Sequence, residues 1–351
     1  MALTDYTIND DSFYLFACAE LKAREKEFIE EQKIKRMVGV KSANEFLRML
    51  HETYYSKYLT DTGAGVNYNF ENVATSELKS MVSFLKDRLK TEHQIIINLL
   101  TLKEDLHNIK LMMKSVFLSR DMEKLFIPVS YSYNQLKRAM DPGSHENIDL
   151  YTGSILQYAA MLGITEKNHR TAELKLELFF LEKLYSLIAA IKSSMVKDFL
   201  KHIIDMFNIK NIYRNKFSGE KIDFDLFLHK NGFLDIKFLK NFENENLEYF
   251  IQQISKTRYA PLVKQAPGLP HEATDEVYSF EKSEELFYIY FFDPVKYTVS
   301  NLEKIVDFFI KKRIELKNLS IVFTGILYDI DRSKIRHEVL LLDEDKNRSN
   351  W

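Results

Sequence analysis

Three short segments of this 351-residue sequence carry an acidic residue and an asparagine at one spacing that could do chemistry. The pairs are Asp105 and Asn108, Asp205 and Asn208, and Glu315 and Asn318. Residues three apart share a helix face, so the carboxylate and the amide would lie side by side. Such pairs could belong to a triplicated catalytic site. They could also bind backbone groups and a basic residue where helices meet.

The surroundings of the three pairs favour the structural interpretation. An apolar residue follows each asparagine, but the polar residues around it differ in all three copies. The copies recur after 100 and then 110 residues, and such self-similarity is the signature of repeated structural units. A second repeated pattern, apolar-x-x-Thr-x-Tyr, occurs at Leu50–Tyr55 and again at Ile254–Tyr259. We therefore interpret the acidic-x-x-Asn signature as a marker of repeated domains.

Other chemical motifs are missing from the sequence. Gly63-Ala64-Gly65 lacks the third glycine of a dinucleotide fingerprint, and no phosphate-binding loop occurs. His51-Glu52 begins like a zinc-binding H-E-x-x-H motif, but Tyr55 takes the place of the second histidine. The single cysteine, Cys18, lies among apolar residues and is expected to be buried. We expect no catalytic residues, no cofactor and no metal.

Composition excludes several partners. The formal net charge is −2, which gives no basic field for nucleic acid. The polar N-terminus does not resemble a signal peptide. The apolar stretch 184–191 ends at Lys192 and is far shorter than the roughly 20 residues that span a bilayer. We expect a protein that neither crosses a membrane nor binds nucleic acid.

The sequence predicts an all-α fold. No proline occurs in residues 1–127 or 143–260, which suits long helices because proline breaks helix interiors. The apolar run 286–292 could be a strand or a buried helix, and its helical neighbours favour the helix. Capping boxes are predicted at Ser42 with Glu45 and at Ser300 with Glu303. Apolar periodicity and turn residues predict helices over 12–30, 42–54, 75–90, 92–118, 172–204, 246–259 and 301–316, with loops over 61–69, 128–145 and 261–270.

The repeat divides this all-α chain into three similar helical domains. We expect them to span residues 1–120, 121–225 and 226–351. Basic residues beside the signatures are candidates for partner contact near helix ends. These are Lys110, Lys114, Lys210, Arg214 and Lys216.

The order of these motifs resembles the C subunit of the bacterial and archaeal V/A-type (V-type) rotary ATPases and ATP synthases, equivalent to the d subunit of the eukaryotic vacuolar ATPase. The resemblance covers about residues 12–340. It is carried by the following segments: the aromatic and alanine-rich first helix with Glu25 and Phe28-Ile29, Leu50-x-x-Thr53-x-Tyr55, Asp205-x-x-Asn208-Ile209 running into Arg214-Asn215-Lys216, and Glu315-x-x-Asn318-Leu319.

The resemblance implies three pseudo-equivalent helical domains in a pseudo-threefold, funnel-like arrangement. It implies a non-catalytic rotor subunit of a hetero-oligomeric complex, peripheral on the cytoplasmic face of the membrane. Its partners would be the central-stalk subunits and the membrane rotor ring. It would transmit torque for proton or sodium transport, without binding nucleotide.

Two other classes remain open from the sequence. The chain could be a soluble helical scaffold or adaptor that binds a partner helix, or a helical enzyme of unrecognised type. Genes for catalytic and ring subunits beside this one would favour the rotor subunit.

Overall fold

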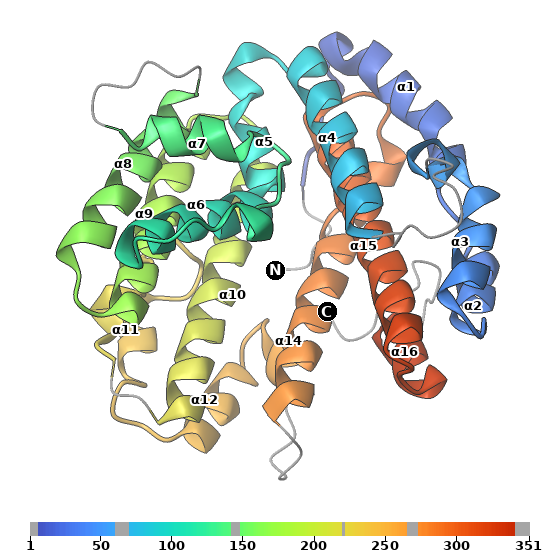
Figure 1. Ribbon diagram of the computed structural model, residues 1–351. Coiled ribbons are helices and arrows are strands. Elements are labelled where there is room, and N and C mark those ends of the chain that lie inside the picture. Colours follow the sequence, from blue (N-terminus) through green and yellow to red (C-terminus); the bar gives the residue numbers. More distant parts are fainter. Residues whose placement is uncertain (1–5, 60–69, 142–147, 220–221, 265–272, 341–351) are drawn as a thin grey trace. The chain divides into compact units, whose positions relative to one another are not determined.

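The computed structural model describes residues 6–59, 70–141, 148–219, 222–264 and 273–340, with only the backbone described for 264 and 273–279. Helices and turns make up these described parts, and no strand occurs in them. The all-α prediction is therefore confirmed for them (Figure 1). No helix in the described parts is long and apolar enough to cross a bilayer.

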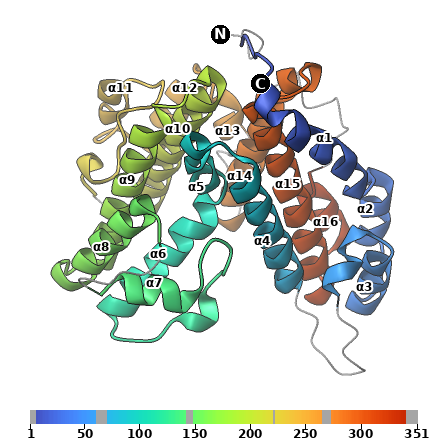
Figure 2. The same ribbon diagram turned by 90° about the horizontal axis from the view of Figure 1, so that it is seen from above.

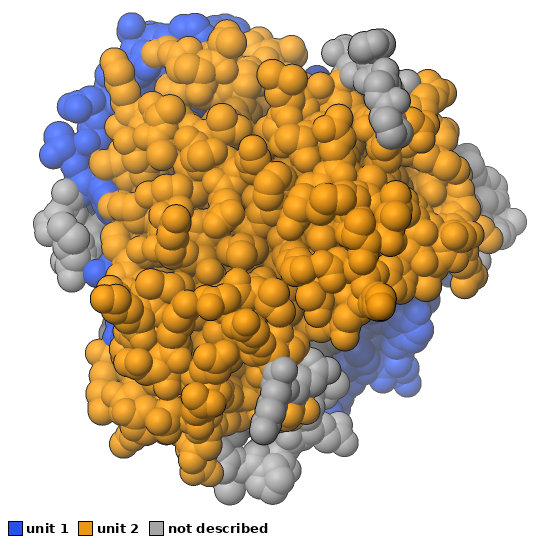
Figure 3. Space-filling view, turned by 90° about the vertical axis from the view of Figure 1, so that its left-hand side faces the viewer, with its two compact units in different colours: residues 1–84, 257–351 blue, residues 85–256 orange. Residues whose placement is uncertain are grey.

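The chain folds into two compact units, coloured in Figure 3. Unit 1 joins residues 1–84 to residues 257–351, and unit 2 contains residues 85–256. Unit 1 contains these α-helices: α1 Leu15–Arg24, α2 Glu31–Val38, α3 Ala43–His51, most of α4 Phe70–Arg88, α13 Ala260–Lys264, α14 Ala273–Phe291, α15 Leu302–Leu327 and α16 Arg332–Glu338. Unit 2 contains these: α5 Ile95–Leu100, α6 Leu102–Phe117, α7 Tyr133–Ala139, α8 Leu150–Thr165, α9 His169–Ile188, α10 Ser194–Ser218, α11 Ile236–Lys240 and α12 Leu247–Ile254.

Short 3-10 helices connect several of these elements. They are η1 Ser12–Tyr14, η2 Glu25–Glu27, η3 Tyr54–Tyr58 and η7 Asp293–Tyr297 in unit 1, and η4 Thr91–His93, η5 Glu123–Leu125 and η6 Phe224–Leu226 in unit 2.

In unit 1, α15 is the central helix and contacts α1, α2, α3, α14 and α16. Buried apolar residues occur on every side of it, from Ile305 to Ile326. In unit 2, α6, α8 and α9 pack side by side, as Figures 1 and 2 both show. Cys18 is buried, as predicted, and its thiol contacts the carbonyl oxygen of Asn301.

Three predicted helices are broken in the structure. Residues 12–30 leave the helix at Phe28, where an extended backbone lets Ile29 donate to Glu315. Residues 92–118 are interrupted at Thr101, whose buried hydroxyl bonds the carbonyl of Ile97. The long helix predicted over 172–204 is two helices, α9 and α10, and Ser193 caps the second. Apolar periodicity continues across these breaks, so it cannot reveal them.

Several predicted boundaries also differ. Residues 128–145 are not simply a loop, because Ser132 and Gln135 form a capping box that starts α7. Asn301, not Ser300, caps α15 and accepts the amide of Lys304. Ser42 caps α3 as predicted, but the Glu45 side chain accepts from Lys41 instead of Ser42.

The remaining element predictions have mixed outcomes. The helix predicted over 246–259 ends as α12 at Ile254. The loop predicted over 261–270 begins inside α13, and the rest of it lies outside the described residues, as does the loop predicted over 61–69. Residues 286–291 are helical within α14, as predicted.

Two glycines of α8 offer a matched test of this packing. A Cβ at Gly163 would lie 3.0 Å from both the carbonyl oxygen of Met113 and Cβ of Val116, where α6 crosses α8. A Cβ at Gly153 would meet nothing within 4 Å. We expect Gly163→Ala to lower the free energy of unfolding by about 1–3 kcal/mol. Gly153→Ala should raise it by up to about 1 kcal/mol. Urea unfolding of both variants measures these free energies. Equal effects of the two substitutions would contradict the prediction.

Candidate functional site: asparagine clamps and a buried polar network

Each asparagine of the signature binds both backbone polar groups of one residue that follows it by 19 to 22 positions. Its Nδ2 donates to the carbonyl of that residue, and its Oδ1 accepts the amide N–H. The pairs, with these two distances, are Asn108 with Ile127 (2.7 and 3.0 Å), Asn208 with His229 (2.8 and 2.9 Å) and Asn318 with Leu340 (2.6 and 2.9 Å). We call this arrangement the asparagine clamp. It fixes a returning segment against the helix that carries the signature.

The acidic residue of each signature holds a further group. Asp105 accepts from the hydroxyl of Thr101 at 2.6 Å, and Asp205 accepts the amides of Phe233 and Leu234. Glu315 accepts the amide of Ile29 at 2.7 Å and forms an ion pair with Lys312 at 3.1 Å. The expected pairing of the acid with a base is therefore seen in the third copy.

Gly232 is required by the contact of Asp205. An added Cβ at this glycine would lie 1.9 Å from Oδ1 of Asp205, so only glycine lets the backbone fold this closely over the carboxylate.

Burial lowers the pKa of His229, the residue clamped by Asn208, to about 4. The clamped segment thus contains a neutral imidazole.

Burial makes the contribution of Asp105, the acid of the first copy, to stability depend on pH. It raises the pKa of Asp105 to about 7, well above the value near 4 that is usual for an unfolded chain. Between about pH 4 and pH 7 the folded state binds the extra proton, so this group's contribution to stability falls as the pH rises. Over this window, the free energy of unfolding of the parent protein should fall relative to that of Asp105→Asn by up to about 1.4 kcal/mol per pH unit.

Urea unfolding at several pH values checks this prediction. Asp121→Asn is the control, because the exposed Asp121 has a lowered pKa, owing to the backbone N–H of Glu123. Asp121→Asn should not change the pH dependence of the free energy of unfolding in this direction. If the parent protein and Asp105→Asn show the same pH dependence, the prediction is wrong.

The three signature helices also end alike. A residue with positive φ follows the asparagine by eleven positions in each copy: Ser119 (φ 48°), Gly219 (φ 68°) and Asp329 (φ 52°). Within the described ranges, these are the residues with positive φ. The repeat therefore extends from the acid through the clamp to the helix end.

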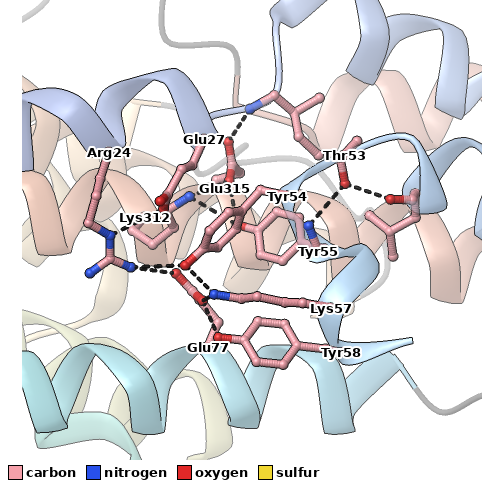
Figure 4. Close-up of polar contacts among 12 residues, drawn as sticks. Arg24, Glu27, Thr53, Tyr54, Tyr55, Lys57, Tyr58, Glu77, Lys312 and Glu315 are labelled. Atoms are coloured by element: carbon pink, nitrogen blue, oxygen red, sulfur yellow. Dashed lines mark hydrogen bonds and ion pairs between the residues drawn. The ribbon is translucent and has the colours of Figure 1, made fainter. Parts of the chain in front are cut away.

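A buried polar network occupies unit 1 (Figure 4). Glu77 of α4 is fully buried and lies 3.5 Å from the guanidinium of Arg24 and 3.8 Å from the ammonium of Lys57. Its other bond comes from the hydroxyl of Tyr58 at 2.7 Å. Arg24 also donates to the hydroxyl of Tyr54. These contacts join α1, η3 and α4.

The second half of the network surrounds Lys312 of α15. Its ammonium is buried, lies 3.3 Å from the hydroxyl of Tyr55 and 4.2 Å from the ring centre of Phe28, and is paired with Glu315. Tyr55 donates its hydroxyl proton to Glu315. Burial raises the pKa of Glu315, with Lys312 opposing the shift, and it raises that of Tyr55 as well. The network thus ties residues 24–77 to the C-terminal segment of the same unit.

The five predicted contact lysines and arginines have different surroundings. Lys110 and Lys114 of α6 pair with Glu177 and Glu173 of α9. Lys216 donates to the carbonyl of Glu243 at 2.6 Å. Lys210 is half-buried in α10, whereas the side chain of Arg214 is exposed. Their role in partner contact stays a prediction.

The network and the clamped residues could not be predicted from the sequence. Arg24 and Glu77 belong to no motif, and Tyr55 belongs to the apolar-x-x-Thr-x-Tyr pattern. Lys312 lies in the basic run Lys311-Lys312-Arg313, which is typical of a solvated face or a partner contact, but its side chain is buried. The distance of 260 positions between Tyr55 and Glu315 leaves no local signal. In the described part of the chain, no group of three His, Cys, Asp or Glu residues could hold a metal ion.

In its described parts the chain is thus an all-helical protein in which buried acids, amides and a lysine bind helices to one another and to returning segments. The family model of the ATP synthase (C/AC39) subunit matches residues 17–338, and the chain belongs to this family. Its members that are named as C subunits are accessory subunits of the complex, not the catalytic ones.

Curated relatives match along most of the chain. The C subunit of the A-type ATP synthase of Methanocaldococcus jannaschii is 21% identical, with 94% of this chain and 86% of the relative aligned. The protein of the same name in Methanosarcina acetivorans is 21% identical, with 94% of each chain aligned. The C subunit of the V-type sodium ATPase of Enterococcus hirae is 21% identical over 87% of this chain and 91% of its own length.

Proposed function

We propose that this chain is a central-stalk rotor subunit of a V/A-type rotary ATPase, equivalent to the d subunit of the eukaryotic vacuolar enzyme. It links the central stalk to the membrane rotor ring and transmits torque for proton or sodium transport. It acts from the cytoplasmic face of the membrane, without a cofactor. The observation that carries this proposal is the family match over residues 17–338.

The internal bonds support a mechanical role. A subunit that passes torque must resist shear between its helices. The buried network of unit 1 and the asparagine clamps fasten helices to one another and to returning segments. The repetition of clamp and helix end in three copies supports three similar domains in a pseudo-threefold, funnel-like arrangement. The bounds 1–120, 121–225 and 226–351 stay a proposal, because the first two clamps cross them to reach Ile127 and His229.

Isolation of the native complex tests the proposal. The subunits should be located in a cryo-EM map of the intact assembly. We expect this chain between the central stalk and the ring. A position on the static peripheral stalk, or absence from the assembly, would contradict the proposal.

Arg214 offers a test of partner contact. It is the exposed member of the predicted basic set, and its reversal to Glu should weaken retention in the complex without unfolding the chain. Lys192→Glu is the matched control, because Lys192 is an exposed cation of the same unit outside the signature. Co-purification with tagged stalk or ring subunits measures the effect. Equal retention of both variants would remove Arg214 from the contact surface.

A further inference from the structure

The acid of the first signature copy is held by a different kind of group from the acids of the other two copies. Asp205 accepts two backbone amides, and Glu315 accepts one amide and pairs with an ammonium. Amides and ammonium groups can only donate. In the described residues, the donors that face the carboxyl of Asp105 are the hydroxyls of Thr101 and Ser130. A hydroxyl can donate or accept, so this site can hold either a carboxylate or a protonated carboxyl.

The hydroxyl of Thr101 favours the protonated carboxyl. Its single proton has two partners, the carbonyl oxygen of Ile97 at 2.8 Å and Oδ2 of Asp105 at 2.6 Å. When Asp105 is ionised, both partners are acceptors, so the hydroxyl can donate to only one of them. When Asp105 is protonated, it donates to Thr101, which then donates to Ile97. The protonated form therefore completes a chain of two hydrogen bonds from α6 to α5, which the ionised form lacks.

The charges around this site also oppose ionisation. The carboxyl of Asp105 is buried and faces three acidic groups, which are Glu104 of α6, Tyr151 of α8 and Asp149, the N-cap of α8. Burial, with Glu104 and Asp149, raises the pKa of Asp105 to about 7. Charged groups of neighbouring elements have partners of their own: Glu173 and Glu177 of α9 pair with Lys114 and Lys110, and the ammonium of Lys86 lies over the ring of Tyr131.

Residues 127–131, which we call the cover segment, run along the face of α6 that carries Asp105 and Asn108. Asn108 binds both backbone groups of Ile127. Three positions further along the segment, Ser130 lies beside Asp105, which is three positions earlier in the helix. The hydroxyl of Ser130 is buried and forms no hydrogen bond of normal geometry within the described ranges. The cover segment therefore lies against the buried carboxyl, and its opening would admit water there.

We propose that the protonation state of Asp105 controls the opening of the cover segment. The protonated carboxyl is satisfied without water, so the segment stays closed. The ionised carboxylate is buried with too few donors for its charge, and water that enters through the open segment supplies them. Unit 2 therefore becomes looser at this segment as the pH rises from acid to neutral. This inference concerns unit 2 alone and does not rest on the proposed function.

Amide hydrogen exchange of the full chain between about pH 5 and pH 8, corrected for the intrinsic rate at each pH, tests the inference. The amides of Ile127 and Val129 report on the cover segment, because they donate to Asn108 and to the carbonyl of Ile127. Their protection should fall by up to about tenfold per pH unit until about pH 7 and then level off. No fall in the parent chain would overturn the inference.

Two variants connect this fall to Asp105. Asp105→Asn should abolish the fall, because its side-chain amide does not titrate and still donates to Thr101. Asp121→Asn is the matched control and should keep the fall, since Asp121 is an exposed aspartate of the same unit. The same fall in Asp105→Asn as in the parent chain would overturn the inference.

Two further measurements need no variant. The NMR chemical shift of the Asp105 carboxyl carbon should titrate near the pH at which protection levels off, whereas a midpoint at about pH 4 would overturn the inference. The amide of the buried Leu176 in α9 reports on global unfolding. Ile127 and Val129 should exchange faster than Leu176, at rates that low urea concentrations do not change. If all three amides exchange through one common unfolding, the cover segment does not open by itself and the inference is wrong.

Discussion

Replacement of Glu315 by glutamine is expected to lower the free energy of unfolding by about 3–5 kcal/mol. Glu315 and Lys312 have side chains only 3% and 1% exposed, so the change leaves a buried ammonium without its counter-charge. Glutamine can still accept from Ile29 through its carbonyl oxygen, but its NH2 group then replaces the oxygen that accepts from Tyr55. The predicted loss therefore comes mainly from the missing counter-charge of Lys312, with a smaller part from the lost bond of Tyr55.

The double variant Lys312→Met, Glu315→Gln separates these two causes. It removes both charges and keeps an acceptor for the amide of Ile29. We expect it to recover at least half of the stability lost in Glu315→Gln, because a buried ion pair contributes less than its rupture costs. Urea unfolding measured by circular dichroism provides the values.

Glu25→Gln is the control for this experiment. Glu25 pairs with Lys22 on the surface, where both side chains are well exposed, and such pairs contribute little. A double variant less stable than Glu315→Gln would contradict the explanation. So would an effect of Glu315→Gln no larger than that of Glu25→Gln.

The sequence predicted the fold class because apolar residues at helical spacing are a local signal. The internal repeat of the acidic-x-x-Asn spacing identified the signature asparagines. It could not predict the residues that they clamp, because Ile127, His229 and Leu340 lie in segments without periodicity. Their contacts involve backbone groups, which every residue possesses.

The interruptions of the long helices show a second limit. The apolar pattern of α9 continues into α10, so periodicity alone merges them. The break needs Ser193, whose hydroxyl accepts the amide of Val196 at 3.1 Å. Serine is also common at other places on helices, so its capping role is evident only from the backbone geometry.

Loss of an asparagine clamp is the second change expected to have a large effect on stability. Asn208→Ala would leave the carbonyl and the amide of His229 buried without partners, at a cost of about 1–3 kcal/mol for each group. We therefore expect a loss of about 2–6 kcal/mol in the free energy of unfolding. Amide hydrogen exchange at His229 should accelerate at the same time, because its N–H loses its acceptor.

A neighbouring asparagine of the same helix is the matched control. Asn211 is also buried, but its Nδ2 donates to no acceptor within the described residues. Asn211→Ala should therefore cost about 1 kcal/mol or less. Equal losses for Asn208→Ala and Asn211→Ala would show that the clamp contributes nothing beyond the burial of an amide.

The other two clamps each act on a segment of their own. The bonds of Asn318 are fully buried like those of Asn208, whereas those of Asn108 are only partly buried. Asn318→Ala should therefore resemble Asn208→Ala, and Asn108→Ala should cost less, because water can satisfy the freed groups of Ile127. Asn108 and Asn208 share no clamped residue, so their losses should add to within about 0.5 kcal/mol in the double variant. A double loss that departs from that sum by much more than about 0.5 kcal/mol, in either direction, would show that the two clamps of unit 2 are coupled.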